Sequence, residues 1–177
     1  MDVYVDATPL IALGTVGELD LPTTFDGRLV APEAVLREVT TEPARTNVER
    51  FCEREDVLVR PVSSAMGVEH AKELLGEEGV NGDVQIIADV LVSTAFPVGP
   101  IGVVSDDRRV RTVADGLGAT VTGTVGVIVR AVESGLDERE AKELVRRIDS
   151  HGLHMTGELR ERAYELIEAA AERRSDR

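Results

Sequence analysis

Short β-branched runs separated by segments with helical periodicity limit the possible folds of this chain more than any other feature. Strands that alternate with helices pair in parallel, and the helices then cover both faces of the sheet. The sequence therefore predicts an α/β domain with a central parallel sheet. The predicted strands are Val3–Val5, Arg28–Ala31, Val57–Pro61, Ile101–Val104 and Ala119–Thr122.

Helices are predicted between these strands and at the end of the chain. Pro9 and Pro32 stand where proline favours the first turn of a helix, and Thr8 is a suitable N-cap for the first one. We expect residues 1–135 to form the main domain and residues 136–177 a helical extension packed on it. The predicted helices are Pro9–Val16, Pro32–Glu42, Val48–Glu55, His70–Leu75, Gly82–Thr94, Arg108–Leu117, Val125–Glu133, Asp137–Ile148 and Thr156–Glu172, with loops at Phe96–Pro100 and around Gly152.

Several classes of protein are disfavoured by composition. Cys52 is the single cysteine, which excludes an internal disulfide and a zinc site built on two or more cysteines. The opening segment MDVYVDATPLIAL lacks the basic region of a secretory signal. The apolar runs are far shorter than the roughly 20 residues of a membrane-spanning helix. We therefore expect a cytoplasmic protein with no membrane segment.

The charge balance is strongly acidic and poor in lysine. The formal net charge is −13, from 33 acidic and 20 basic residues, and Lys72 and Lys142 are the lysines among them. This composition is typical of halophilic proteins, because in molar salt the Debye length of about 3 Å screens acidic surfaces. An ordinary acidic protein is the alternative. In both cases a polyanionic substrate needs a bridging metal ion or local arginines.

Acidic residues stand at positions where α/β proteins build their sites. Asp6 follows the first predicted strand directly, and Asp106 and Asp107 follow the strand IGVV. Glu38 lies inside the second predicted helix, and Asp83 opens the long apolar helix. Sites in parallel sheets form beyond the carboxyl ends of the strands. These acids therefore lie side by side if the first and fourth strands are neighbours.

A cluster of carboxylates suits a hard divalent cation. Neighbouring carboxylates raise each other's pKa unless a cation neutralises them, and Mg²⁺ and Mn²⁺ prefer oxygen ligands. Such a site can activate water and stabilise the leaving oxygen of a phosphodiester. Each acid also has an ordinary structural interpretation: Asp6 or Asp83 as a helix cap, and Glu38 as a solvated helix residue.

Four segments resemble, in the right order, the motifs of PIN-domain nucleases. They are VDATPLIAL, APEAVLREV, NGDVQIIADV and VVSDDRRVRTVADGLGATVTGTVGVIVRA, and together they run from Val3 to Ala131. The resemblance is closest to a PIN-like subgroup of prokaryotic proteins with an Asp-Ala-x-Pro-Leu signature, whose ending is similar to HGLHMTGELRERAYELI. In the third motif, Asp89 stands where the family usually has a small or apolar residue, and we interpret it as a surface substitution.

The resemblance implies a three-layer α/β/α sandwich and an endoribonuclease that depends on Mg²⁺ or Mn²⁺. It implies catalytic and metal-binding roles for four acids, Asp6, Glu38, Asp83 and Asp107. Asp106 is a less certain metal ligand, and Thr8 and Ser105 are auxiliary groups. Three arginines are candidates to steady the RNA backbone: Arg108, Arg109 and Arg111. Many relatives are toxins of the VapC type that are inhibited by an antitoxin protein, and homodimers are common among them.

Other interpretations compete with a nuclease. A PIN-like module that binds RNA or protein without catalysis keeps the same fold. A small-molecule phosphatase or another Rossmann-like metal enzyme uses similar acids, whereas a nucleotide-binding site needs a glycine-rich turn that VDATPL lacks. Proton-transfer chemistry by His70, His151 or His154 is disfavoured; we expect His151 and His154 to lie in a surface turn, where the spacing indicates no partner acid.

Overall fold

Five short strands form one parallel sheet in the computed structural model, which describes residues 1–62, 65–95, 99–151 and 153–175. The strands are β1 (Asp2–Val5), β2 (Arg28–Pro32), β3 (Val57–Arg60), β4 (Ile101–Val104) and β5 (Thr120–Thr122). Their order is β3-β2-β1-β4-β5, so the order of strands reverses between β1 and β4. Such a reversal opens a crevice beyond the carboxyl ends of the two strands. The predicted parallel sheet is confirmed.

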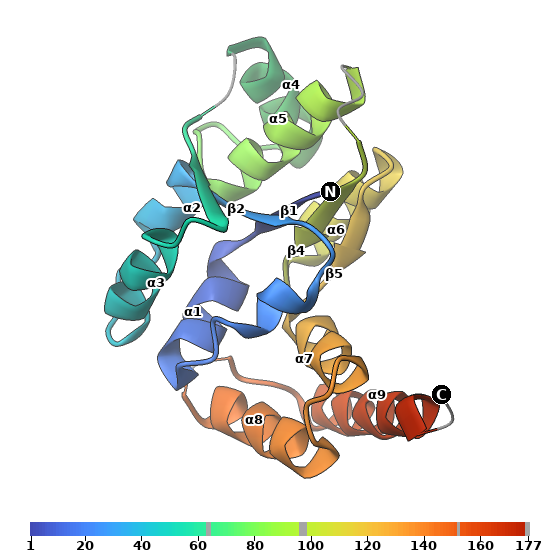
Figure 1. The fold of residues 1–177 in the computed structure, drawn as a ribbon. Helices are drawn as coiled ribbons and strands as arrows, with labels where there is room; N and C mark the ends of the chain where they lie inside the picture. Colours follow the sequence, from blue (N-terminus) through green and yellow to red (C-terminus); the bar gives the residue numbers. More distant parts are fainter. Residues whose placement is uncertain (63–64, 96–98, 152, 176–177) are drawn as a thin grey trace.

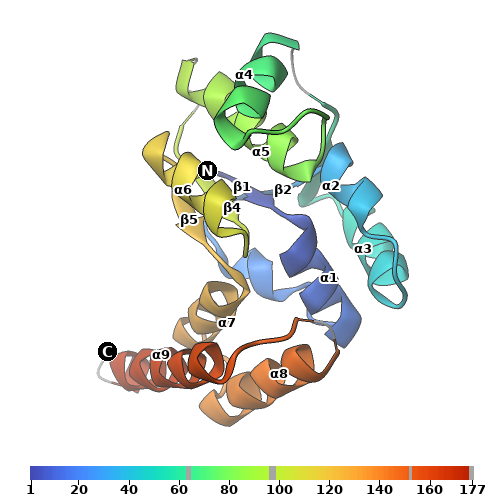
Figure 2. The same ribbon diagram turned by 180° about the vertical axis from the view of Figure 1, so that it is seen from behind.

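Helices cover both faces of this sheet (Figures 1 and 2). Helices α4, α5 and α6 lie on one face, and α1, α3 and α7 lie on the other, with α8 packed on α1 and α9 on α7. This is the predicted three-layer α/β/α arrangement. The helices are α1 (Ala7–Val16), α2 (Glu33–Glu38), α3 (Ala44–Cys52), α4 (Ala65–Leu75), α5 (Gly82–Ala95), α6 (Arg108–Gly116), α7 (Thr124–Glu133), α8 (Glu138–His151) and α9 (Gly157–Ser175), with a 3₁₀ turn, η1, at Leu21–Thr24.

The central strands are buried on both faces, as their continuous apolar sequences predict. Val3, Tyr4 and Val5 of β1 are each at most 1% exposed. Val5 lies opposite Val104 in the register of β1 and β4, and the backbone N–H of Asp6 donates to Val104 O at 2.9 Å. Strands β1 and β4 therefore end at the same edge of the sheet, and Asp6 is the first residue after β1.

Three helix ends differ from the predictions. Asp6, and not Thr8, is the N-cap of α1, because its carboxylate accepts the N–H of Ala7. Helix α2 ends at Glu38 instead of Glu42, where a run of β-branched residues with low helix propensity follows. Helix α3 begins at Ala44 instead of Val48, directly after a proline that suits a helix start.

Helix α4 and two connections also differ from the predictions. Helix α4 begins at Ala65 and is longer at its amino end than the predicted His70–Leu75. The predicted loop at Phe96–Pro100 lies partly outside the described residues, as does the link around Gly152. No helix in the described ranges is long and apolar enough to cross a lipid bilayer.

Asp89 is buried, which contradicts its interpretation as a surface substitution. It is 2% exposed and lies in α5. Burial raises the pKa of the Tyr4 hydroxyl to about 12, and the neighbouring Asp89 charge contributes to this shift. The prediction failed because neighbouring elements bury most of α5, including the face of the helix that carries Asp89.

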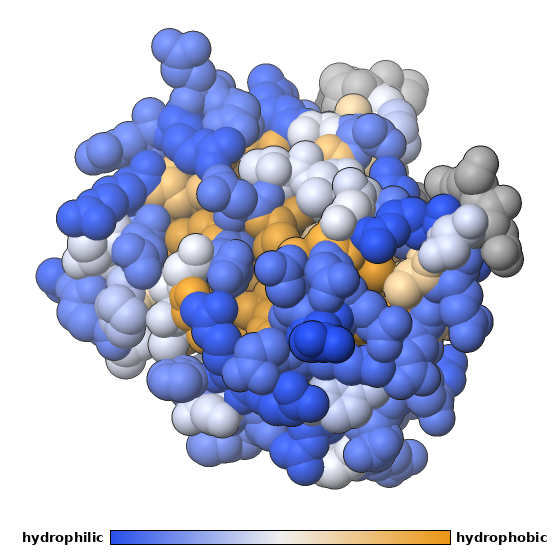
Figure 3. Space-filling view, turned by 60° about the horizontal axis from the view of Figure 1, so that its bottom comes forward, coloured by the Kyte–Doolittle hydropathy of each residue, from blue (hydrophilic) through white to orange (hydrophobic). Residues whose placement is uncertain are grey.

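The two carboxyl-terminal helices share the hydrophobic core with the rest of the chain. Their surface is largely hydrophilic, with apolar side chains showing between charged ones (Figure 3). A domain boundary after residue 135 remains a prediction. The core residues that they contribute are Ala141, Leu144, Val145, Ile148, Ala163, Ile167 and Ala170.

We predict that Ile167→Ala lowers the free energy of unfolding by about 2–4 kcal/mol, because it leaves a cavity in a shared core. Ile167 is 0% exposed, whereas Leu159 on the same helix is 44% exposed. The control Leu159→Ala should change stability by no more than about 0.5 kcal/mol. Calorimetry should show one cooperative transition, and a separate transition for the last two helices would contradict a shared core.

Candidate active site

Asp6 and Ser105 meet where the chain leaves β1 and β4. Asp6 is 4% exposed, and its Oδ1 accepts the backbone N–H of Ala7 at 2.7 Å. The Ser105 hydroxyl donates to Asp6 Oδ2 at 2.6 Å and accepts the backbone N–H of Asp107 at 3.1 Å. Burial raises the pKa of Asp6, while its hydrogen bonds with Ser105 and Ala7 lower it. Ser105 therefore links two of the predicted acids through one buried hydroxyl.

Asp107 is the N-cap of α6. Its Oδ1 accepts the N–H of Arg109 at 2.6 Å and that of Val110 at 3.1 Å. This satisfies two backbone donors of the first helical turn, which have no partner within the helix. The Asp107 side chain is thereby fixed at the start of α6, beyond the carboxyl end of β4.

Glu38 lies at the start of α5, although it belongs to α2. Its Oε1 accepts the backbone N–H of Gly82 at 2.6 Å. A Cβ atom at Gly82 would lie 2.8 Å from Val35 Cγ2 and 3.1 Å from Glu38 Oε1, so only glycine permits this approach. The next residue after Gly82 is Asp83, and α2 and α5 thus bring a second pair of acids together.

Gln85 holds the first turn of α2, and it is a positioning residue that was not predicted from the sequence. Its side chain is fully buried, Oε1 accepts the N–H of Ala34 at 2.8 Å, and Nε2 donates to Arg60 O at 2.9 Å. Helices α2 and α5 are therefore joined by two bonds, one from a side chain of each helix. The signal was present, because a glutamine among the apolar residues of NGDVQIIADV requires buried partners.

Asp106 holds the start of α7. Its Oδ1 accepts the backbone N–H of Thr124 at 2.9 Å, and its Oδ2 accepts the Thr124 hydroxyl at 2.5 Å. A Cβ atom at Gly123 would lie 2.5 Å from Asp106 Oδ1, so this contact also needs a glycine. Asp106 contributes to raising the pKa of Asp6 and so lies near the cluster. Its role as a metal ligand remains a prediction.

Asp83 shows that the four principal acids share one site. Burial raises its pKa to about 6, and the charges of Asp6, Asp107 and Glu38 add to the rise. Arg109 opposes it, with Nη2 at 3.5 Å from Asp83 Oδ2. The charges of the three other acids thus act on Asp83, and we call Asp6, Glu38, Asp83 and Asp107 the acid cluster; their catalytic and metal-binding roles remain predictions.

The auxiliary residue and the arginines lie around this cluster in different environments. Thr8 is exposed in the first turn of α1. Arg108 is exposed at the start of α6. Arg111 Nη1 donates to Ser105 O at 2.9 Å and so supports the turn after β4. Their predicted roles toward RNA are not tested by these contacts.

The acid cluster offers only oxygen donors. Within the described residues, no three His, Cys, Asp or Glu side chains are already arranged to hold a metal ion. The chemistry of the donors nevertheless fits Mg²⁺ or Mn²⁺, which prefer carboxylates and water, and a cation would relieve the repulsion that raises the pKa of Asp83. His70, His151 and His154 are all exposed.

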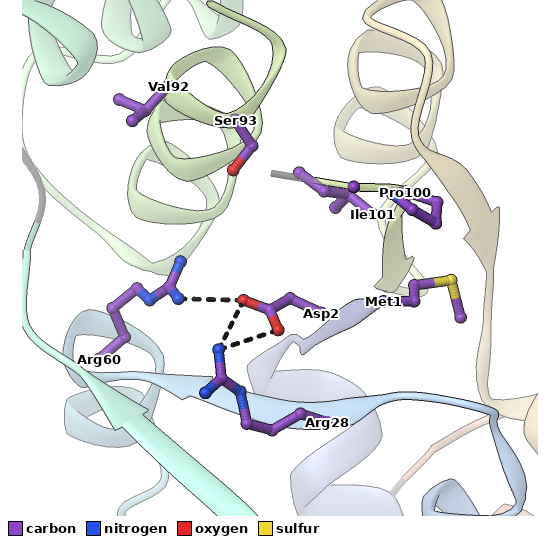
Figure 4. A pocket seen from close by; sticks show the side chains of 9 residues that line it. Met1, Asp2, Arg28, Arg60, Val92, Ser93, Pro100 and Ile101 are labelled. Atoms are coloured by element: carbon purple, nitrogen blue, oxygen red, sulfur yellow. Dashed lines mark hydrogen bonds and ion pairs between the residues drawn. The ribbon is translucent and has the colours of Figure 1, made fainter. Parts of the chain in front are cut away.

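A separate pocket lies at the amino ends of the central strands (Figure 4). It has a volume of about 350 Å³, and its lining includes Asp2, Arg28, Arg60 and Ser93. Arg28 and Arg60 both bind Asp2, at 3.0 Å each. Asp2 opens β1 and Asp6 follows its end, so this pocket is distinct from the acid cluster.

These features define a class: a parallel α/β domain with carboxylates gathered beyond two adjacent strands at the reversal of strand order. A comparison with sequence families matches residues 2–169 to a model described as a PIN domain, and the chain therefore belongs to the PIN-domain family. PIN domains are usually nucleases and generally use divalent metal ions. A comparison with curated proteins found no match.

We predict that Asp83→Asn stabilises the protein above pH 6 when a chelator is present. The pKa of Asp83 rises from 3.8 to about 6 on folding, so the folded state binds this proton more tightly than the unfolded state. Ionised Asp83 therefore costs stability, and the cost grows as the pH rises from about 4 to 6 and is constant above that range.

Chemical denaturation of both proteins at pH values between 4 and 8 measures this effect. The advantage of Asp83→Asn should shrink toward pH 4. The control Asp115→Asn changes an exposed acid on α6 and should show no such trend. Equal pH profiles for Asp83→Asn and the unmodified chain would contradict the electrostatic coupling of the cluster.

Proposed function

We propose that this chain is an endoribonuclease that depends on Mg²⁺ or Mn²⁺ and hydrolyses RNA phosphodiester bonds. The observation that carries the proposal is the meeting of two acid pairs at the reversal of strand order. Ser105 links Asp6 to Asp107, while Glu38 accepts a hydrogen bond from the residue before Asp83. Membership of the PIN-domain family supports a nuclease at the coarser level.

The acid cluster supplies the ligands in this proposal. The four carboxylates of Asp6, Glu38, Asp83 and Asp107 would hold the cation, with Asp106 as an auxiliary acid. When bound, a divalent cation lowers the pKa of water and stabilises the negative charge that develops on phosphoryl oxygens. Hydrolysis forms a bond from a water oxygen to phosphorus and breaks the bond from phosphorus to one ribose oxygen.

The other residues of the site orient these groups. The Ser105 hydroxyl fixes the Asp6 carboxylate, because it binds Oδ2 while the start of α1 binds Oδ1. Thr8 stands exposed in the first turn of α1, next to Asp6 in the chain. Arg108 is exposed at the start of α6, where a guanidinium suits a phosphate of the RNA backbone.

The net charge of the chain makes a cation necessary for this substrate. At −13, the average surface repels a polyanion, so binding depends on the metal ion and on exposed arginines such as Arg108 of α6. High salt weakens that repulsion. Adaptation to high salt therefore remains our prediction for the natural environment of the protein.

The finer biological role is also a proposal. By its resemblance to VapC-type proteins, the chain would act as the toxin of a toxin–antitoxin pair, with a homodimer as its natural state. A short upstream gene for a DNA-binding protein that relieves growth arrest caused by this chain would support the role. Expression without any effect on growth would contradict it.

We predict that Asp6→Asn lowers Mn²⁺-dependent RNA cleavage at least about a hundredfold, because it removes one charged ligand from the cluster. Asparagine keeps the Oδ1 acceptor for the Ala7 N–H, although its amide NH2 cannot accept the Ser105 hydroxyl, so the variant should still unfold in one cooperative transition in chelator. Asp115→Asn, at an exposed position of α6, is the matched control and should cleave normally.

The measurement uses purified protein, labelled RNAs of mixed sequence, and Mn²⁺ or Mg²⁺ added to metal-free buffer. Full activity of Asp6→Asn would refute the assignment of the site. An unmodified chain that binds RNA but does not cleave it under these conditions would favour a binding module without catalysis.

A further inference from the structure

Arg109 contacts three segments at once, and these contacts distinguish it from its neighbours on α6. Its Nη1 donates to Leu75 O, at the end of α4, at 2.7 Å. Its Nη2 donates to Glu77 Oε1 at 2.6 Å and lies 3.5 Å from Asp83 Oδ2. The planar guanidinium, with five donors in a fixed fork, is suited to such a bridge.

The bridge ties the start of α6 to the end of α4 and to the first turn of α5. A cation is favoured beside the last carbonyls of a helix, where the helix dipole is negative. Leu75 is the last residue of α4, so Arg109 meets this condition. The side chain of Arg109 is 45% exposed, while those of Glu77 and Asp83 are 27% and 20% exposed, so water screens both ion pairs in part.

The position of Arg109 also matters for charge. The backbone N–H of Arg109 binds Asp107, and its side chain reaches Asp83, so one residue contacts two members of the acid cluster. Its charge lowers the pKa of Asp83 against the rise caused by burial and by the other acids. Arg111 instead donates to the Ser105 carbonyl. Arg108 and Arg109 are both exposed, but Arg109 reaches Glu77 and Asp83.

We infer that Arg109 is an internal counter-ion of the acid cluster, which stabilises the metal-free protein and weakens the binding of a divalent cation. The second effect, weaker binding of a divalent cation, rests on the proposed function, because it requires that the acid cluster binds a metal ion. This counter-ion role differs from the RNA contact that the sequence suggested for Arg109. A guanidinium held by Leu75, Glu77 and Asp83 is already engaged within the protein.

Two opposite effects follow for Arg109→Gln. The metal-free protein loses one charge that offsets repulsion within the cluster, so its melting temperature in chelator should fall by about 2–4 °C. A divalent cation no longer faces a fixed positive charge, so the Kd for Mn²⁺ should fall about threefold to tenfold. A residue that merely supports the fold would lower stability without tightening metal binding.

Two variants serve as controls. Arg109→Lys keeps the positive charge but cannot reach all three acceptors, so it should lose stability while its Kd for Mn²⁺ stays near that of the unmodified chain. Arg108→Gln removes an exposed charge of the same helix and should change the Mn²⁺ affinity less than Arg109→Gln. Isothermal titration calorimetry with Mn²⁺ alone, without RNA, gives the affinities.

A double-mutant cycle separates this inference from the proposed function. In chelator, Arg109→Gln should cost less stability in an Asp83→Asn background than in the unmodified chain. Equal costs in both backgrounds would overturn the counter-ion, as would an unchanged or weaker Mn²⁺ affinity in Arg109→Gln. If the unmodified chain bound no Mn²⁺, the proposed function would fail, and the cycle would still decide whether Arg109 and Asp83 are coupled.

Discussion

Hydrogen bonds from the amino ends of helices to carboxylates are the interactions on which the candidate site depends. Helices α1, α5 and α6 all begin at the site, and their first N–H groups bind Asp6, Glu38 and Asp107 respectively. The first N–H groups of a helix lack partners within it, and this end of the helix carries a partial positive charge. Both effects favour carboxylates at this place. Acids that would otherwise repel one another are thus held close before any cation arrives.

The strand order determines which helix starts meet. Because β1 and β4 are neighbours, the residues that follow them share one crevice, and Ser105 comes within reach of Asp6 across 99 positions of sequence. The sequence predicted the strands, since each is a short apolar run, and it placed acids at two of their ends. It did not determine that β1 and β4 pair, because pairing depends on contacts between segments far apart. The structure supplied that step.

The failures of prediction share a physical cause. Asp89 was assigned to the surface because an acid usually lies there, yet α5 is packed against the sheet and against α4, and the residue is buried. Gln85 was overlooked because its partners, Ala34 and Arg60, belong to other elements. Charge and periodicity describe one helix at a time. They cannot show which side chains a neighbouring helix will enclose, and that is where positioning residues such as these are found.

Gly123 shows that a substitution in this chain can be harmful without removing a reactive group. No side chain fits there without displacing Asp106, and Asp106 secures the start of α7, on which α9 rests. Replacement of a residue with no reactive group would therefore disturb the structure by moving Asp106. In a survey of all single substitutions, intolerance alone would not separate positions that perform chemistry from positions that keep space open for it. Assays that score folding and cleavage independently would make that separation.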